Sequence, residues 1–183
     1  MSRDIWVISD THFRHSNILK FTDRHTKKLV RPGFSDVDEM DEYMIQQWNS
    51  VVKEGDIVYH LGDVLIGDIE WFKKNWPRLK GSKRLIVGNH DDIKFLSSGG
   101  FFKKIGMWRM FTEFGLILSH VPLHTSNLLR LLDKTKIYPD DAIELLNVHG
   151  HIHQHKSPDG PYKNVSVEAI NYTPVNIEQL RII

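Results

Sequence analysis

Short apolar runs that end in glycine or in polar side chains recur along the whole chain. The clearest is Leu85-Ile86-Val87, which runs directly into Gly88-Asn89-His90-Asp91. A short apolar run that ends in this way predicts a buried strand that presents polar groups at its C-terminal end. Runs of this kind predict strands over residues 5–8, 56–64, 83–87, 101–102, 107–111, 116–118, 145–148 and 165–167.

Helical spacing of apolar residues is clearest after residue 34. Apolar side chains recur there every three or four positions, which predicts an amphipathic helix with Ser35 as its N-cap and Gly55 beyond its end. The apolar stripe consists of Val37, Met40, Met44, Ile45 and Trp48. Asp68 is predicted to cap a second helix over residues 69–76. Loops and shorter helices are predicted over residues 13–34, 92–98, 121–144 and 176–180.

The composition is that of an ordinary globular protein. The 183 residues are 40% hydrophobic and 26% charged, so we expect one compact domain over residues 1–183. The formal net charge of +1 does not indicate nucleic acid as a partner, but it leaves room for a local basic patch. The absence of cysteine excludes disulfides and thiolate metal sites. The N-terminus resembles neither a signal peptide nor a membrane span, so a cytoplasmic protein is expected.

Histidine is abundant, and most of the 11 histidines lie where the predicted strands end. In an extended segment, residues two apart point to the same side, so Asp10 and His12 are expected to share a face, as are His151 and His153. Burying many such groups without partners would cost on the order of several kcal/mol each, and a bound metal centre would supply the partner. Five strand ends carry these groups: Asp10-Thr11-His12, Gly62-Asp63, Gly88-Asn89-His90-Asp91, Ser119-His120 and Gly150-His151-Ile152-His153.

The order of these groups is specific. D-x-H, G-D, G-N-H-D, a single H and G-H-x-H, in that order, resemble the motifs of the calcineurin-like metallophosphoesterase superfamily over residues 4 to about 175. The compact length is similar to that of small uncharacterised phosphoesterases of bacteria and phages. The resemblance implies an α/β fold, a four-layer α-β-β-α sandwich of two mixed β-sheets flanked by helices. It also implies two metal ions where the strand ends converge.

The resemblance implies the following ligands. One metal ion would be held by Asp10, His12 and His153, the other by Asn89, His120 and His151, and Asp63 would bridge the two. Hard oxygens mixed with imidazoles suit divalent transition metals, with Mn expected first and Fe, Zn, Ni or Co as alternatives. Two such ions would clamp a phosphoryl group and lower the pKa of a bound water, so that hydroxide attacks phosphorus directly.

The resemblance gives His90 a role other than metal binding, namely assisting the leaving group. Asp91 either orients His90 or is a structural carboxylate of the turn. After Gly62-Asp63 the chain lacks the second Asp and the Arg of the G-D-x-x-D-R-G motif of protein Ser/Thr phosphatases. Phosphoprotein phosphatase and symmetrical dinucleoside tetraphosphatase activities are therefore not expected. Arg14, or the basic residues between 20 and 31, would have to replace the missing phosphate contact.

The predicted function is that of a binuclear-metal-dependent phosphoester hydrolase, more specifically a phosphodiesterase acting on a small or nucleotide-type substrate. One alternative is a phage or bacterial nuclease that processes nucleic acid, for which a basic groove around residues 14–31 would be the sign. A non-catalytic metal-binding scaffold is the other. No membrane partner is expected, and the sequence leaves the physiological substrate, the native metal and the oligomeric state open.

Overall fold

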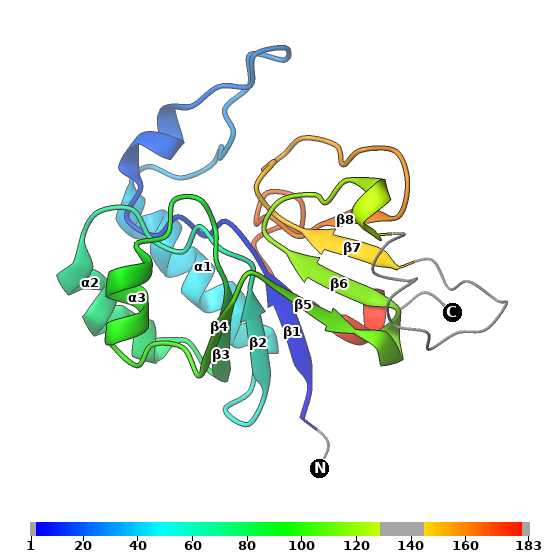
Figure 1. Cartoon of the computed structure of the whole chain (residues 1–183). Coiled ribbons are helices and arrows are strands. Elements are labelled where there is room, and N and C mark those ends of the chain that lie inside the picture. Colours follow the sequence, from blue (N-terminus) through cyan, green and yellow to red (C-terminus); the bar gives the residue numbers. More distant parts are fainter. Residues whose placement is uncertain (1–2, 129–144, 181–183) are drawn as a thin grey trace, which may run out of the picture.

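Two mixed β-sheets form the centre of the molecule in the computed structural model, which describes residues 3–128 and 145–180 (Figure 1). The first sheet has the order β4-β3-β2-β1-β9, in which β1 to β4 pair in parallel and β9 is antiparallel to β1. Its strands are β1 (Ile5–Ile8), β2 (Ile57–His60), β3 (Ser82–Ile86), β4 (Lys104–Gly106) and β9 (Val175–Asn176).

The second sheet has the order β5-β6-β7-β8. The pair β5–β6 is antiparallel, whereas β6–β7 and β7–β8 are parallel. Its strands are β5 (Trp108–Phe111), β6 (Leu116–Ser119), β7 (Leu146–His149) and β8 (Tyr162–Asn164).

Alternating side chains of the central strands decide how the sheets pack. In β1, Val7 faces the second sheet and joins a core cluster with Leu118 and Val148. The next residue, Ile8, faces the opposite side and packs with residues of the helices. This period of two is what an apolar strand buried on both faces requires. The apolar cluster that contains Val7, the inner cluster, therefore packs the two sheets against each other. The cluster that contains Ile8 packs the helices against the first sheet.

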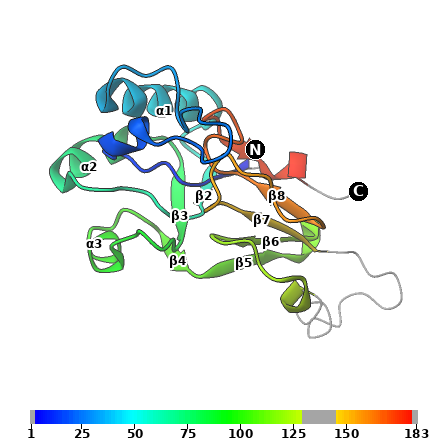
Figure 2. The ribbon, with the colours of Figure 1, turned by 90° about the horizontal axis from the view of Figure 1, so that it is seen from above.

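Three α-helices cover the outer face of the first sheet: α1 (Val37–Val51), α2 (Ile69–Asn75) and α3 (Ile93–Ser98) (Figure 2). The predicted cap of α2 is confirmed, because the Asp68 side chain accepts from the Trp71 N–H. The predicted cap of α1 is wrong. Asp36 caps it by accepting from Glu39 N–H at 2.9 Å, while Ser35 donates to the Glu39 carboxylate from outside the helix.

Short 3₁₀ helices complete the described secondary structure: η1 (Ser16–Lys20), η2 (Trp76–Arg78), η3 (Thr112–Phe114) and η4 (Ile177–Leu180). The outer face of the second sheet packs Ile117 against Leu128 and Leu145. In the segment 121–144, predicted as a loop and helices, residues 125–128 are helical, residues 121–124 are not, and residues 129–144 lie outside the described residues. The predicted four-layer α-β-β-α class with two mixed sheets is confirmed. None of the described helices is long and apolar enough to cross a membrane.

Two predicted strands are wrong. Phe101 and Phe102 instead pack among aromatic rings, and the Trp76 indole donates to the Phe101 carbonyl at 3.1 Å. Residues 165–167 form one isolated bridge, because Ser9 pairs with this segment only where β1 ends. The strands predicted over 107–111 and 116–118 correspond to β5 and β6, which pair in the second sheet. The strand that precedes them is β4, which was not predicted and belongs to the first sheet.

His60 is a buried, neutral part of this framework. Its Nε2 bonds to the Thr11 hydroxyl at 2.9 Å and its Nδ1 accepts from Gly62 N–H at 3.2 Å. Because the Thr11 hydroxyl already donates to the Val64 carbonyl, it accepts from His60. Burial lowers the pKa of His60 to about 3, with nearby His120 acting in the same direction.

Acid should therefore destabilise the fold through His60. The folded state holds this pKa below its unfolded value, so the stability that His60 contributes is present above about pH 6.5 and is lost as pH falls towards about 3. Between about pH 7.5 and about pH 5, wild type should lose about 2 kcal/mol more free energy of unfolding than His60→Gln. Urea denaturation of metal-stripped protein measures both losses. Equal losses would contradict the prediction.

Candidate metal centre

Polar residues from five strand ends meet at one edge of the two sheets. Parallel neighbours place their C-terminal ends at the same edge, so the groups after β1, β2 and β3 come together. The groups after β6 and β7 come together in the second sheet for the same reason. Six of the residues predicted as metal ligands lie here in two clusters of three.

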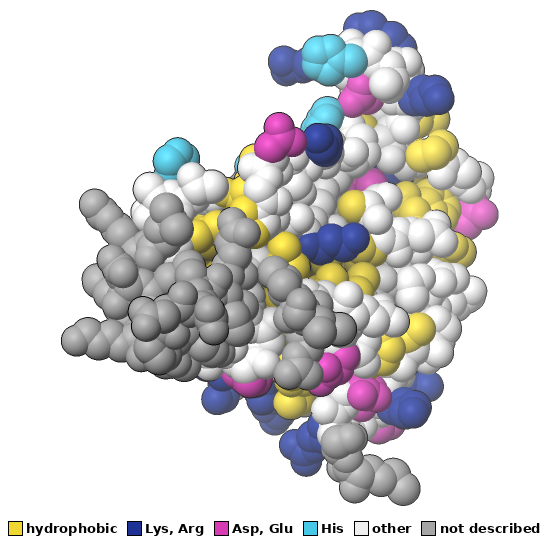
Figure 3. Space-filling view, turned by 90° about the vertical axis from the view of Figure 1, so that its right-hand side faces the viewer, with side chains coloured by type: hydrophobic (Ala, Val, Ile, Leu, Met, Phe, Trp, Pro, Cys, Tyr) yellow, Lys and Arg dark blue, Asp and Glu magenta, His cyan; other side chains and the backbone are white. Residues whose placement is uncertain are grey.

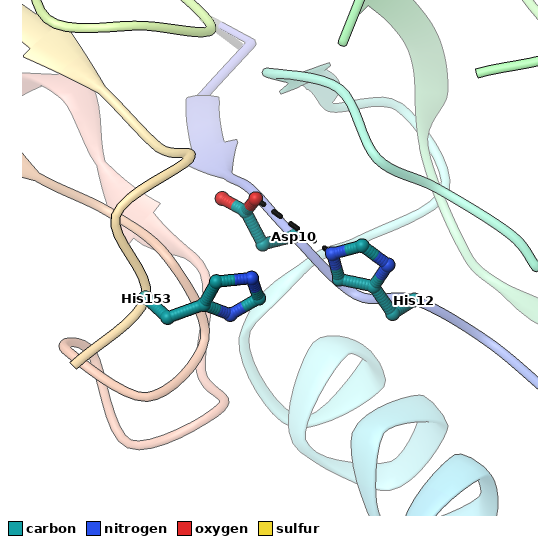
Figure 4. Close-up of side chains that lie close together, drawn as sticks. All are labelled: Asp10, His12 and His153. Carbon is teal, nitrogen blue, oxygen red and sulfur yellow. Dashed lines mark ion pairs between the residues drawn. The ribbon is translucent and has the colours of Figure 1, made fainter. Parts of the chain in front are cut away.

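The first cluster consists of Asp10, His12 and His153, whose ligand atoms lie within 4.8 Å of one another (Figure 4). The His12 and His153 rings are stacked with centroids 5.1 Å apart, and His12 Nε2 lies 4.0 Å from Asp10 Oδ1. Both of these atoms are buried without a hydrogen-bond partner among the described residues. Burial raises the pKa of Asp10 and lowers that of His12. A cation would satisfy both orphaned atoms.

The second cluster consists of Asp63, His120 and His151, again with ligand atoms within 4.8 Å of one another. His120 Nδ1 lies 2.7 Å from the Leu61 carbonyl, to which it must donate. In the tautomer that donates only from Nδ1, Nε2 carries a lone pair, and it lies 2.8 Å from Asn89 Oδ1, another acceptor. Two acceptors that face each other at this distance suit two ligands of one cation.

Asp63 lies between the clusters. Its Oδ2 is 3.6 Å from His12 Nε2 and 3.5 Å from His120 Nε2, so a single carboxylate oxygen touches both. Its Oδ1 is fixed by the His90 N–H at 2.8 Å. This is the position that a ligand shared by two ions would occupy. The donor set of carboxylate and amide oxygens with imidazoles, without thiolate, fits divalent first-row transition metals.

A pocket of about 750 Å³ opens in front of the two clusters. His12, His90 and His153 line its inner end. The apolar part of its wall comes from Ile18, Phe21, Val30 and Ile152. Its size is within the range of small-molecule sites, and its lining combines these apolar side chains with many polar ones, among them Asp23, Arg24 and Gln154.

Comparison with known proteins agrees with this geometry. Residues 3–178 match the family model of calcineurin-like phosphoesterases. The chain belongs to the calcineurin-like phosphoesterase family. It is 34% identical over 190 residues to an uncharacterised protein of Methanocaldococcus jannaschii, covering 96% of this chain and 88% of that one.

Two further relatives of this calcineurin-like phosphoesterase extend the comparison. The gene 66 protein of Mycobacterium phage L5 is 32% identical over 93 residues, which are 47% of this chain and 39% of the phage protein. A crystal structure of a protein of unknown function from Aquifex aeolicus has a TM-score of 0.67 and 26% identity, with 98% of each chain covered. The predicted membership of the superfamily is therefore confirmed.

The backbone of the site differs from the prediction. Asp10 and His12 do not lie in an extended segment, because their φ angles are 59° and 46°, and the same holds for His151 and His153 at 69° and 50°. Asp63 has φ 57° as well. Non-glycine residues with left-handed φ cost free energy and persist where surrounding contacts enforce them. Here those contacts include backbone bonds from Asp10 to Gly62 and from His12 to Asp63, each 3.0 Å long.

Two glycines allow the strand ends to approach closely. A Cβ at Gly88 would overlap the Asp63 carboxylate, and one at Gly150 would overlap Ser9 and the Asp10 carboxylate. In this calcineurin-like phosphoesterase the glycines of both motifs therefore make room for a carboxylate of a neighbouring loop. The constraint on Gly88 is this close approach of the Asp63 carboxylate.

Asp91 connects two of the loops. Its carboxylate accepts from Gly88 N–H at 2.8 Å, Val64 N–H at 2.9 Å and Asp63 N–H at 3.1 Å. All of its hydrogen bonds among the described residues go to the backbone. The carboxylate thereby fixes the end of β3 against the end of β2, where Asp63 and His90 lie.

Two functional residues carry no motif in the sequence, Glu168 and Arg31. Glu168 Oε1 accepts from His153 Nδ1 at 2.9 Å and from Arg31 Nε at 2.7 Å. The Arg31 guanidinium also donates to the backbone carbonyls of Asp10 and Thr11. Burial acts to raise the pKa of Glu168, but Arg31 and His153 hold it at about 2. Glu168 thus orients His153 with Nε2 towards the first cluster. In the sequence, Glu168 stands out only as an acidic residue within the mainly apolar run 165–170.

Two of the basic residues expected to contact phosphate, Arg14 and Arg31, are engaged elsewhere. Arg14 pairs with Asp38 and Asp41 and lies over the Trp71 ring at 5.2 Å. Arg31 is buried behind the first cluster. Of the cations between 20 and 31, Arg24 lines the pocket.

Glu168→Gln should lower the free energy of unfolding by about 3 kcal/mol, because it leaves the Arg31 guanidinium buried without a countercharge. Urea denaturation followed by circular dichroism measures the change. Glu113→Gln, at an exposed position, serves as the control and should stay within about 0.5 kcal/mol of wild type. Equal stability of the two variants would show that the Arg31–Glu168 ion pair contributes nothing to the free energy of unfolding.

Proposed function

We propose that the protein is a binuclear-metal-dependent phosphoester hydrolase, and more specifically a phosphodiesterase that acts on a small or nucleotide-type substrate. The observation that carries the proposal is the position of Asp63 Oδ2, 3.6 Å from a histidine of one cluster and 3.5 Å from a histidine of the other. A carboxylate oxygen shared between two sets of ligand atoms is what a two-ion site needs. Family membership supports the same chemistry.

The proposed ligands follow from the two clusters. Asp10, His12 and His153 would hold one ion, Asn89, His120 and His151 the other, and Asp63 both. Mn is the metal we expect first, and Fe, Zn, Ni and Co suit the same donors. When bound, such a pair clamps a phosphoryl group and lowers the pKa of a bound water towards neutrality.

His90 is proposed to be the catalytic residue that the chain itself supplies. It lines the pocket, its ring lies 5.7 Å from the His12 ring, and its N–H is held by the bridging carboxylate. From there its imidazole would donate a proton to the departing oxygen. We assign Asp91 to positioning, because its carboxylate accepts from the backbone N–H groups of Gly88 and Asp63 and so joins the loops that carry His90 and Asp63.

A diester suits the pocket better than a monoester. A phosphomonoester carries nearly two negative charges near neutral pH, and recognition of that charge usually employs an arginine fork. Arg14 and Arg31 are both committed to carboxylates, and among the described residues the one arginine of the pocket lining is Arg24, from the segment 20–30. The pocket wall next to the clusters is formed by histidines and apolar side chains. A singly charged diester needs less compensation there.

Removing the metal should abolish turnover of bis(p-nitrophenyl) phosphate, and Mn²⁺ should restore it. Asp63→Asn in the metal-loaded protein should lower kcat by at least about a hundredfold, because the shared ligand is lost. Asp159→Asn, at a highly exposed position, is the matched control. Tight metal binding without turnover under any of the five metals would instead favour a non-catalytic scaffold.

His90→Gln should separate good from poor leaving groups. Loss of a general acid lowers the rate by about 10²- to 10⁴-fold where the departing alkoxide needs a proton. A p-nitrophenolate leaving group needs little protonation, so its kcat should fall much less. Steady-state kinetics with an alkyl and a p-nitrophenyl diester test this, and His124→Gln, an exposed histidine that bonds Ser126, is the control. Equal losses for both diesters would remove His90 from the acid role.

A further inference from the structure

Residues 20–30 form an arm that projects from the body (Figure 1), and several of its residues line the pocket. Its two sides are joined by the bridge between Thr22 and Leu29 and by backbone bonds from Val30 to Phe21 and from Asp23 to Lys28. It is therefore a built, hairpin-like element. It is also the most exposed part of the basic region 14–31.

The arm concentrates positive charge. Four of its side chains are basic and exposed, and one is acidic, so it carries a formal +3 in a chain whose total is +1. The basic residues are Lys20, Arg24, Lys27 and Lys28. None of them forms an ion pair with another described residue. Figure 3 shows basic and histidine side chains gathered at the top of the molecule, where the arm projects.

The single acidic residue of the arm, Asp23, holds the arm in place and forms no ion pair with its four basic side chains. Its carboxylate accepts from His25 N–H and Thr26 N–H within the turn. It also accepts from the Gln154 side chain at 3.1 Å and lies 3.6 Å from His155 Nδ1. These bonds tie the arm to the segment that carries His151 and His153. The arm thus forms one wall of the pocket, and the metal centre lies at the inner end.

An exposed aromatic side chain marks the base of the arm. Phe21 is 49% exposed and lines the pocket. Its ring stands edge to face with His15 at 5.4 Å, and His15 in turn lies 5.6 Å from the His12 ring. A flat apolar surface therefore lies one histidine away from the first cluster. Exposed aromatic surface next to a line of cations is the combination on which single-stranded nucleic acids bind, by base stacking and phosphate pairing.

We propose that the arm binds a single-stranded nucleic acid, with an unpaired base on Phe21 and phosphates of the neighbouring nucleotides on the four cations. This inference rests on the proposed function, since the strand would carry its scissile phosphodiester into the metal centre. Lys27 and Lys28 lie outside the pocket lining, so a single small nucleotide bound in the pocket would leave them without a contact. A paired base would not expose the face that Phe21 stacks on.

The test compares a labelled oligothymidylate of about ten nucleotides with the dinucleotide TpT and with bis(p-nitrophenyl) phosphate, using Mn²⁺-loaded protein. At low salt, kcat/KM for the long strand should exceed that for TpT by at least about tenfold. Lys27→Glu/Lys28→Glu should lower kcat/KM for the long strand, relative to bis(p-nitrophenyl) phosphate, by about tenfold. In anisotropy titrations of metal-stripped protein with the long strand, the same change should make the salt dependence of log K shallower by about 1.4.

Matched controls isolate the arm. Phe21→Ala should weaken binding of the long strand by about tenfold, whereas Leu29→Ala, on the same hairpin and 46% exposed but outside the pocket lining, should not. Lys103→Glu/Lys104→Glu reverses an equally exposed lysine pair at the far edge of the first sheet. It should leave strand binding and every rate unchanged.

The outcomes separate the two proposals. If bis(p-nitrophenyl) phosphate is hydrolysed but the long strand is no better than TpT and is insensitive to the arm variants, the strand proposal is wrong and the phosphodiesterase proposal stands. If no substrate is hydrolysed, the proposed function fails. Anisotropy then decides on the arm by itself: equal affinities for wild type, Phe21→Ala and the arm lysine variant would overturn it.

Discussion

The structure depends on two buried carboxylates, Asp10 and Asp63, whose two oxygens have different contacts. Asp10 uses Oδ2 to accept from the His151 N–H and the Ser166 hydroxyl, while its Oδ1 has no hydrogen-bond partner in the described part of the chain. Asp63 uses Oδ1 for the His90 N–H and turns Oδ2 towards two histidines. In each case one oxygen holds loops of the fold together while the other faces the site. A buried negative charge is stable only when it is compensated, so the fold and a bound cation support each other.

The site is assembled from both sheets, and this makes the core between them part of its geometry. Asp10, Asp63 and Asn89 follow strands of the first sheet, whereas His120, His151 and His153 follow strands of the second. The inner apolar cluster sets the separation of the sheets and therefore of the two sets of ligand atoms. Close packing resists small displacements, which is what a site that needs ligands placed within fractions of an ångström requires.

The tertiary contacts that place the ligands also hold the backbone of the site in strained conformations. Five of the seven proposed ligands have left-handed φ angles, and the loops around them are held by backbone bonds, by Asp91 and by the buried Arg31. Arg31 reaches the Asp10 and Thr11 carbonyls from behind and meets Glu168, which holds His153. The rigid centre and the projecting basic arm are thus different kinds of element, one built for fixed geometry and the other presenting exposed charge.

The sequence by itself determined the strands that end at the site, the Asp68 cap of α2, the apolar stripe of α1 and the ordered motifs that identify the family. These signals are local, because a short apolar run or a helical stripe needs only neighbouring residues. The left-handed φ of Asp10 and His12 and the Arg31–Glu168 pair were decided by tertiary structure. Arg31 and Glu168 are 137 residues apart, and only the order and packing of the strands bring such distant groups into contact. Local periodicity carries no information about that order.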